Sequence, residues 1–431
     1  MFEHLSHIDP QVWPGIAHVP GGRARAHKAK LAESRFAAMC TKAGIALVAE
    51  VDEHVEPAQM ASMRIDHDAL FARISDCGWL GLAESYMAEE WTSPDIAMVL
   101  EALIQVGYKP KTTRSLFKTK HKTPAPPGEL PDNLVQLYGG AYTGLFATGI
   151  STTLREAIKS YSPGAGKGNE PARHYVDITT ITDPLEVDRD DLPNAQLRAI
   201  DSLLDLAHVE SGSDVLEWPL SGSALIGAIQ DRGAVVDSLT TDPDRARAIG
   251  ARCGDAANIH VVDSAIPSRH QWRGRYDAVI SVDRFEVLGE VGAVPFIKTV
   301  ERLLGSGGSA VIQTVVATRP LDPVVLEALR PIQAYIWPTL HFHTIDEIHR
   351  LVDRHSTMRV VTEKHLGGHF TETLRLKREI FEGHSNQAAA LGYDRVYRRL
   401  WVYYFALLEA LCEMGLIEMV QLELKGRRKA Y

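Results

Sequence analysis

The sequence predicts an α/β protein in which a doubly wound, mostly parallel sheet follows a smaller α-rich domain. Two observations lead to this fold class. Between residues 195 and 316, short apolar stretches alternate with amphipathic helical stretches, which is typical of a parallel sheet with crossover helices. Between residues 64 and 106, apolar side chains recur at helical spacing, and a polar, proline-rich stretch follows at 109–130. We therefore expect one domain with its linker over 1–125 and a second domain over 126–431.

The strands and helices of the second domain follow one another in a regular order. An amphipathic helix, AQLRAIDSLLDLAHV, is expected to precede the first strand. The strands that follow are expected at DVLEW, AVVDSLTT, NIHVVD, YDAVISVD and SAVIQTVV. Right-handed crossovers place the ligand crevice of such a sheet at the carboxyl ends of its strands. Residues 371–414 are expected to be mainly helical, and IEMVQLELK is expected to form a final strand.

Composition and charge exclude several classes of protein. The chain has 431 residues and a formal net charge of −9, whereas a dedicated nucleic-acid binder would be strongly basic. Its four cysteines show no C-x-x-C spacing, so we expect reduced thiols rather than a disulfide framework or a zinc site. The sequence shows neither a secretory signal nor an apolar run of about 18 residues, which favours a cytoplasmic protein. The basic stretches GGRARAHKAK and KGRRKAY are expected to be solvated tails; the alternative is peripheral contact with an anionic membrane, at its inner face.

Six stretches of the sequence occur in the order found in one enzyme family. They are WLGLAESYMAEEWTSPDI, DVLEW, YDAVISVDRFEVLGE, VIQTV, ETLRLKREIF and ALGYDRVYRRLWVYYFALLEA. In this order they resemble the cyclopropane-fatty-acyl-phospholipid synthases, and more specifically the actinobacterial branch that includes acyl-phospholipid C-methyltransferases. The likeness extends from about Trp13 to about Leu424.

The resemblance implies a Rossmann-like methyltransferase domain behind a smaller N-terminal domain. Members of the family use S-adenosylmethionine to methylate the double bond of an unsaturated acyl chain in a membrane phospholipid. The resulting carbocation loses a proton to a bicarbonate ion held in the pocket, and ring closure gives a cyclopropane. Reduction of the alternative methylene product gives a branched chain. The resemblance thus implies S-adenosylmethionine and bicarbonate as cofactors, and phospholipid acyl chains at the membrane surface as partners.

The loop after the first strand departs from the family pattern V-L-E-x-G-x-G-x-G. Glu217 matches the pattern, but Pro219, Ser221 and Ser223 stand at the glycine positions. Glycines let main-chain N–H groups approach a nucleotide closely, whereas proline has no N–H and serine adds a side chain. Gly222 resembles a displaced remnant of the glycines. We therefore expect a strand–loop–helix turn that is kept for the fold, with impaired binding of S-adenosylmethionine.

Three further residues are candidates for contact with the cofactor. Tyr138 matches the tyrosine of the family's H-Y-D-L-S-N loop, although Leu137 and Gly139 replace the histidine and the aspartate. Asp263 matches the acid that faces the adenine in the family. Asp242, at the end of the second strand of the sheet, is expected to approach the ribose.

The expected catalytic residues are Glu286, Gln313 and Asp177. Glu286 matches the glutamate of the family's bicarbonate site. Gln313 stands where synthases have a histidine and where the C-methyltransferase branch also shows glutamine. Asp177 aligns with the cysteine beside the bicarbonate, where a carboxylate would repel bicarbonate unless Asp177 is itself the base. Phe370 replaces a family tyrosine, which removes a hydroxyl donor from this site.

His341 and His343 are spaced to share one face of a strand, which is compatible with a pair of metal ligands. No third ligand is evident from the sequence. We therefore expect a surface or core pair of histidines and no metal site.

Two functions follow from these departures and likenesses. The changes at every ligand-contacting motif favour a cyclopropane-synthase-like protein of fatty acid and phospholipid modification that has weak or no methyl transfer of its own. Such a protein would bind lipid or act as a partner subunit, as a homodimer or as a heteromer with an active paralogue. The alternative is an active C-methyltransferase or cyclopropane synthase on unsaturated phospholipid acyl chains, which the likeness along the chain and Glu286 support.

Overall fold

The computed structural model describes most of the chain and divides it into two compact units. The described residues are 3–21, 23–48, 60–112, 131–135, 137, 142–146, 153–159, 175–254 and 258–426. We call the first unit the helical unit; it comprises Met1–Leu130, Leu321–Pro338 and Lys377–Met414. We call the second the sheet unit; it comprises Pro131–Pro320, Thr339–Leu376 and Gly415–Tyr431.

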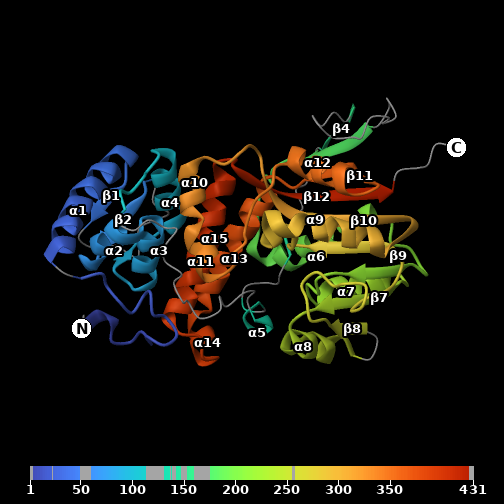
Figure 1. The fold of residues 1–431 in the computed structure, drawn as a ribbon, viewed down its shortest axis with the longest axis horizontal. Coiled ribbons are helices and arrows are strands. Elements are labelled where there is room, and N and C mark those ends of the chain that lie inside the picture. Colours follow the sequence, from blue (N-terminus) through green and yellow to red (C-terminus); the bar gives the residue numbers. More distant parts are fainter. Residues whose placement is uncertain are drawn as a thin grey trace. The chain divides into compact units, whose positions relative to one another are not determined.

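Helices predominate in the helical unit (Figure 1). Its elements are η1 (Glu3–Leu5), α1 (Arg23–Ala43), β1 (Ala46–Val48), β2 (Ser62–Ile65), α2 (Ala69–Cys77), α3 (Trp79–Met87), β3 (Trp91–Thr92), α4 (Ile96–Gln105), α10 (Pro323–Ala328), α11 (Arg330–Tyr335), α14 (Ser385–Ala390) and α15 (Arg395–Glu413). The three strands form a small sheet in the order β1-β2-β3. Helix α13 (Gly368–Gly383) begins in the sheet unit and ends in the helical unit.

The C-terminal helices pack with the N-terminal residues of the chain. Helix α15 contacts α3 and α4, and α11 also contacts α3. Arg395 on α15, for example, donates a hydrogen bond to Glu89, which lies 306 positions earlier in the sequence. The sequence pattern assigned residues 371–414 to the second domain, because periodicity reports the local helix and not the distant surface on which the helix packs.

Buried ion pairs join the elements of the helical unit. Nε of Arg73 lies 2.9 Å from both carboxylate oxygens of Glu90, and both side chains are fully buried. Nε and Nη2 of Arg378 donate to the two carboxylate oxygens of Glu409 at 2.8 and 3.0 Å. Glu90, Arg378 and Glu409 lie in three of the stretches that carry the family resemblance. Those stretches therefore build the scaffold of this unit.

A nine-stranded sheet runs through the sheet unit (Figure 1). Its strands are β4 (Thr153–Lys159), β5 (Tyr175–Ile181), β6 (Asp214–Glu217), β7 (Val235–Thr240), β8 (Asn258–Val261), β9 (Tyr276–Val282), β10 (Leu304–Ala317), β11 (Met358–His365) and β12 (Ile417–Gly426). They lie in the order β4-β5-β11-β12-β10-β9-β6-β7-β8. Strand β12 is antiparallel to both of its neighbours and β4 is antiparallel to β5, whereas all other neighbours are parallel.

Apolar clusters on both faces of this sheet make it doubly wound. The helices of the unit are α5 (Asp132–Val135), η3 (Arg189–Asp191), α6 (Leu192–Leu206), α7 (Ser223–Asp231), α8 (Pro243–Cys253), α9 (Phe285–Leu303), α12 (Ile345–His355) and the start of α13. One buried cluster includes α9, α12 and Val279, and another includes α6, α7, Ala278 and Ile280. Because successive residues of a strand point to opposite faces, the alternation along β9 places the two clusters on opposite faces. The expected Rossmann-like fold is confirmed.

The chain order of the strands locates the ligand crevice of the sheet unit. Strand β6 lies between β7 and β9, so the winding of the sheet reverses between β6 and β9. Open α/β sheets bind ligands outside the carboxyl ends of the strands at such a point. Strand β6 ends at Glu217 and β9 ends just before Asp283. Among the described residues, no helix combines the length and the apolar character needed to cross a membrane.

Candidate functional site

Glu217, at the end of β6, is fully buried and hydrogen-bonded to its own loop. Its Oε1 accepts the main-chain N–H of Ser221 at 2.8 Å and also the Ser221 hydroxyl. Its Oε2 accepts the hydroxyl of Ser238, on β7, at 2.6 Å. Burial raises the pKa of Glu217, and the serine donors partly oppose that shift. The carboxyl group is therefore occupied by contacts inside the protein.

The main chain of the loop is also committed to internal contacts. The N–H of Trp218 donates to a carbonyl of β9 at 2.9 Å, and the N–H of Leu220 donates to a carbonyl of β7 at 2.6 Å. Pro219 has no N–H, and the N–H of Ser221 is bonded to Glu217. Within the described residues 218–221, no main-chain N–H is left for a ligand. The side chains of Trp218 and Leu220 are buried in the core.

Two side chains close around Ser221 from other elements. The hydroxyl of Tyr142 is hydrogen-bonded to the Ser221 hydroxyl, and Nη2 of Arg245, on α8, donates to the Ser221 carbonyl at 2.8 Å. The backbone of Gly222 is extended. A Cβ atom added at this residue would meet only the Tyr142 ring, at 3.9 Å. Gly222 is thus the part of the loop that retains a bare main chain.

The remaining candidate cofactor residues lie at separate positions. Asp242 is the N-cap of α8, where its Oδ1 accepts the N–H groups of Asp244 at 2.9 Å and Arg245 at 3.2 Å. Such a cap satisfies main-chain donors that the helix leaves unpaired, so the structure gives Asp242 a structural role. Asp263 is exposed just after β8. Tyr138 lies outside the described residues.

Glu286 is buried near the start of α9, with Thr314 as its hydroxyl donor. Oγ1 of Thr314, on β10, donates to Oε2 of Glu286 at 2.6 Å. Burial, followed by the nearby charge of Asp283, raises the pKa of Glu286 to about 8. Burial therefore favours the protonated form of Glu286, and the negative charge of Asp283 adds to the effect.

Gln313 is brought close to this group, but its amide is already bonded. Its Oε1 accepts from Nε2 of Gln421 at 3.0 Å, and its Nε2 lies 3.4 Å from Oδ1 of Asp283. A main-chain hydrogen bond also joins Gln313 to Asp283: the N–H of Asp283 donates to the Gln313 carbonyl at 3.0 Å. The structure thus gathers Glu286, Asp283 and Gln313 at the carboxyl ends of β9 and β10.

The structure does not bring Asp177 to this group. Asp177 lies on β5 and forms an ion pair with Arg155 on β4. The Arg155 guanidinium holds the pKa of Asp177 below its usual value. Strands β11, β12 and β10 separate β5 from β9, which at about 4.8 Å per strand is roughly 19 Å. The motif alignment placed Asp177 in one site with Glu286 and Gln313, whereas the structure places Asp177 on a distant strand of the sheet.

The internal contacts limit which donors remain at the two positions that the resemblance assigns to cofactors. A nucleotide at residues 218–221 would find no main-chain donor, and Glu217 already accepts three hydrogen bonds. A bicarbonate ion beside Glu286 would face the acidic group of Asp283, with the Gln313 amide engaged elsewhere. No local sequence signal indicates the roles of Ser238 and Thr314, because each lies on a neighbouring strand.

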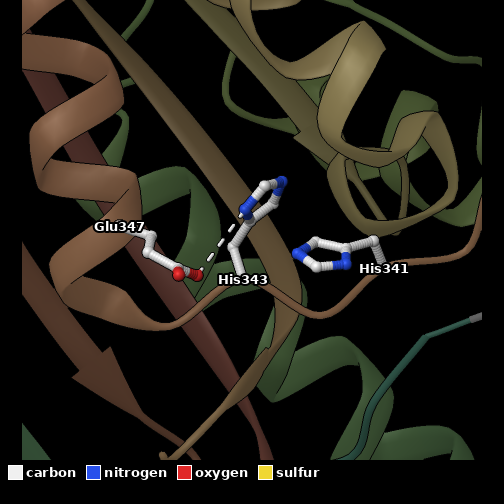
Figure 2. Close-up of side chains that lie close together, drawn as sticks. All are labelled: His341, His343 and Glu347. Atoms are coloured by element: carbon white, nitrogen blue, oxygen red, sulfur yellow. Dashed lines mark ion pairs between the residues drawn. The ribbon is translucent and has the colours of Figure 1, made fainter. Parts of the chain in front are cut away.

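The two histidines have a third possible ligand close by, which was not evident from the sequence. Donor atoms of His341, His343 and Glu347 all lie within 4.8 Å of one another (Figure 2). Burial, followed by the neighbouring His341, lowers the pKa of His343 to about 4. The sequence signal was present: Glu347 follows Thr344 at the T-x-x-E spacing of a capping box, which turns the glutamate back toward the start of the helix.

Comparisons with known proteins connect this fold with one family. A family model described as mycolic acid cyclopropane synthetase matches residues 184–422. Tuberculostearic acid methyltransferase UfaA1 of Mycobacterium tuberculosis (strain ATCC 25618 / H37Rv) is 29% identical over 424 residues, covering 96% of this chain and 95% of that protein.

Two solved structures share the fold. Mycolic acid cyclopropane synthase CmaA1 in its apo form is 17% identical, with a TM-score of 0.50, and the match covers 68% of this chain and 99% of that one. Coclaurine N-methyltransferase is 14% identical, with a TM-score of 0.51, and the match covers 80% of this chain and 96% of that one.

Proposed function

Because the chain belongs to the mycolic acid cyclopropane synthetase family, we propose that it serves lipid modification with weak or no methyl transfer of its own. It acts as a lipid-binding protein or as a partner subunit, in a homodimer or in a heteromer with an active paralogue. The observation that carries this proposal is the loop 218–221, whose main-chain N–H groups are bonded inside the protein. The ligand in this proposal is the acyl chain of a phospholipid at the membrane surface.

The energetic cost of such a loop supports the proposal. Loss of one preorganised donor in a catalytic site costs about 3 kcal/mol of transition-state stabilisation, or about two orders of magnitude in rate. Here Pro219 lacks its N–H, and the N–H groups of Trp218, Leu220 and Ser221 are bonded to the protein. Several such losses together leave little methyl transfer.

A cavity in the helical unit supports lipid binding. It has a volume of about 630 Å³ and lies against α1, α2 and residues 106–112. Its wall includes apolar side chains such as Leu31, Met39 and Ile74. Its basic lining residues are Lys28, Arg35, Lys42, Lys109 and Lys111. Apolar walls with basic side chains suit an amphiphile that has an acyl chain and an anionic head group.

A second candidate function is an active S-adenosylmethionine-dependent C-methyltransferase on unsaturated phospholipid acyl chains. Two observations favour it. The similarity to a tuberculostearic acid methyltransferase extends over 96% of the chain. Glu286 is kept, and its pKa of about 8 lies close to neutral pH, as is common for acid–base groups in active sites.

A methyl-transfer assay separates the two functions. Purified full-length protein is incubated with methyl-labelled S-adenosylmethionine and vesicles of an unsaturated phospholipid, and label is measured in the extracted acyl chains. We expect no label above the protein-free control. Turnover that Glu286→Gln abolishes would establish the second function instead.

The partner role has its own test. The protein is purified from its native cell, and the proteins that elute with it are identified. A homologue with an intact G-x-G-x-G loop in the same peak is the expected result for a heteromer. A monodisperse homomer would leave lipid binding alone, which flotation with phospholipid vesicles then measures.

A further inference from the structure

We propose that His341, His343 and Glu347 form a binding site for a divalent cation of the zinc class. The two histidines lie on the segment before α12, and Glu347 lies in the first turn of that helix (Figure 2). All three residues belong to the sheet unit. The proposal does not depend on the function proposed above.

The spacing of the donor atoms suits one metal ion better than it suits hydrogen bonds. Nδ1 of His343 and Oε2 of Glu347 are 3.8 Å apart, which is too long for a hydrogen bond. Two ligands of a tetrahedral zinc ion lie about 3.4 Å apart when each bond to zinc is about 2.0–2.1 Å. The ring of His341 points toward the ring of His343, with 4.5 Å between the ring centroids. Small side-chain shifts therefore close the three donors around an ion.

The hydrogen bonding of His343 is a second, independent observation. This side chain is only 6% exposed, and its Nε2 is buried without a hydrogen-bond partner. Its Nδ1 faces the Glu347 carboxylate beyond hydrogen-bond range (Figure 2). Buried polar groups normally have a partner, because an unpaired one costs free energy. A cation between Nδ1 of His343 and Oε2 of Glu347 gives Nδ1 a partner and adds one to Oε2, which already accepts the N–H of Thr344. The buried Nε2 lies on the other side of the ring, outside this contact.

The main chain holds the three ligands in place. The N–H of His341 donates to the Glu286 carbonyl at 2.9 Å, and the carbonyl of His343 accepts from the N–H of Ala317 at 3.0 Å. Glu347 is fixed by the capping box, in which Oε2 accepts the N–H of Thr344 at 2.9 Å. Hydrogen bonds of this kind orient metal ligands and reduce the entropy lost on binding.

The charges around the cluster decide which cation it takes. Oε1 of Glu290, on α9, lies 3.7 Å from Nε2 of His341 and adds a second acid. Arg350 and Arg354 line the same cavity, of about 290 Å³, and oppose any cation by like-charge repulsion. The imidazole nitrogens must therefore supply the affinity. Nitrogen donors favour zinc and its neighbours in the transition series, whereas Mg²⁺ and Ca²⁺ prefer oxygen.

Metal titration of four proteins tests the site. The wild-type full chain and the variants His341→Ala, Glu347→Gln and His355→Ala are stripped with a chelator and titrated with Zn²⁺ by calorimetry. Co²⁺ is then added, because tetrahedral Co²⁺ absorbs in the visible range. Glutamine can replace glutamate in a capping box, so Glu347→Gln keeps the helix start. His355→Ala is the matched control, since His355 lines the same cavity outside the cluster.

We expect one Zn²⁺ per wild-type chain, with Co²⁺ bands of tetrahedral intensity. Loss of groups that only orient a ligand weakens metal binding about 10–100-fold, so loss of a ligand should weaken it at least tenfold. His341→Ala and Glu347→Gln should each show this loss, whereas His355→Ala should bind as the wild type does. Absence of Zn²⁺ uptake by the wild type, or equal affinity in all four proteins, overturns the proposal.

Discussion

Two buried carboxyl groups of the helical unit and two of the sheet unit have different hydrogen-bond partners. In the helical unit, Glu90 and Glu409 each meet a buried arginine. In the sheet unit, Glu217 and Glu286 meet serine and threonine hydroxyl groups. A guanidinium favours the charged form of a buried carboxylate, although burial still raises the pKa of Glu90 to about 7. The hydroxyl donors of Glu217 and Glu286 oppose the cost of burial only in part.

The acids with arginine partners belong to the scaffold of the helical unit, whereas the acids with hydroxyl partners lie at the ligand crevice of the sheet unit. The arginine-paired acids lie in stretches that resemble the family; one pair joins α2 to the residue before β3, and the other joins α13 to α15. The hydroxyl-paired acids lie at the carboxyl ends of β6 and β9, where a sheet of this kind binds its ligand. One hydroxyl donor to Glu217 is Ser221, which stands at a glycine position of the family pattern, and the other is Ser238 on β7. The same fold is thus maintained while the groups that would grip a nucleotide are committed internally.

The largest expected effect comes from breaking an arginine pair. Arg73→Met leaves Glu90 buried without its cation, and removal of one partner of a buried pair costs about 3–5 kcal/mol. Urea denaturation should show this loss in the free energy of unfolding. The control is Arg155→Met, which breaks the exposed pair with Asp177 and should leave the free energy of unfolding nearly unchanged, because solvent screens such a pair. Equal losses in the two variants would remove the distinction between the units.

The second prediction concerns Glu286 and the pH dependence of the free energy of unfolding. The pKa of Glu286 rises from 4.5 to about 8 on folding, so its contribution to stability is complete below pH 4.5 and is lost as the pH rises through 8. Glu286→Gln mimics the neutral acid and can still accept from Thr314. The wild type should therefore lose stability relative to this variant, by a few kcal/mol, between pH 4.5 and 8. Parallel stability profiles would show that Glu286 does not titrate in this range.

Removal of a single hydroxyl from the loop should cost less. Ser221→Ala deletes the hydroxyl that Glu217 accepts and that also meets Tyr142. A buried polar group that loses its partner costs about 1–3 kcal/mol. Ser223→Ala, in the same loop, is the matched control and should change the free energy of unfolding by less than about 0.5 kcal/mol. Equal small changes in both would mean that the loop is not held by Ser221.

The smallest expected effect concerns an exposed cation of the helical unit. Arg35 on α1 lines the apolar cavity and is solvent-exposed. A basic side chain near an anionic membrane contributes about 1 kcal/mol to binding. Arg35→Gln should therefore weaken flotation with vesicles that contain anionic phospholipid about fivefold, without changing the melting temperature. Unchanged flotation would remove the cavity from the lipid-binding role.

The sequence predicted strands β6 to β10 because each strand and helix of residues 195–316 carries its own local pattern, whereas β4, β5 and β11 of the same sheet were not predicted. The final strand, IEMVQLELK, was predicted for the same reason and is β12. The membership of residues 377–414 in the helical unit was not predictable, since it depends on packing against α3 and α4. The departures at Pro219 and Ser221 were visible as residue types, but Ser238, the partner that β7 supplies to Glu217, was not. Glu347 was within reach, because the capping-box spacing indicates its position.

The measurement that tests the account most directly is calorimetric titration of the purified full chain with S-adenosylmethionine and with S-adenosylhomocysteine. The account predicts no saturable heat at millimolar concentrations of either compound, because residues 217–221 keep their donors for the protein. A one-to-one complex with a micromolar dissociation constant would contradict it.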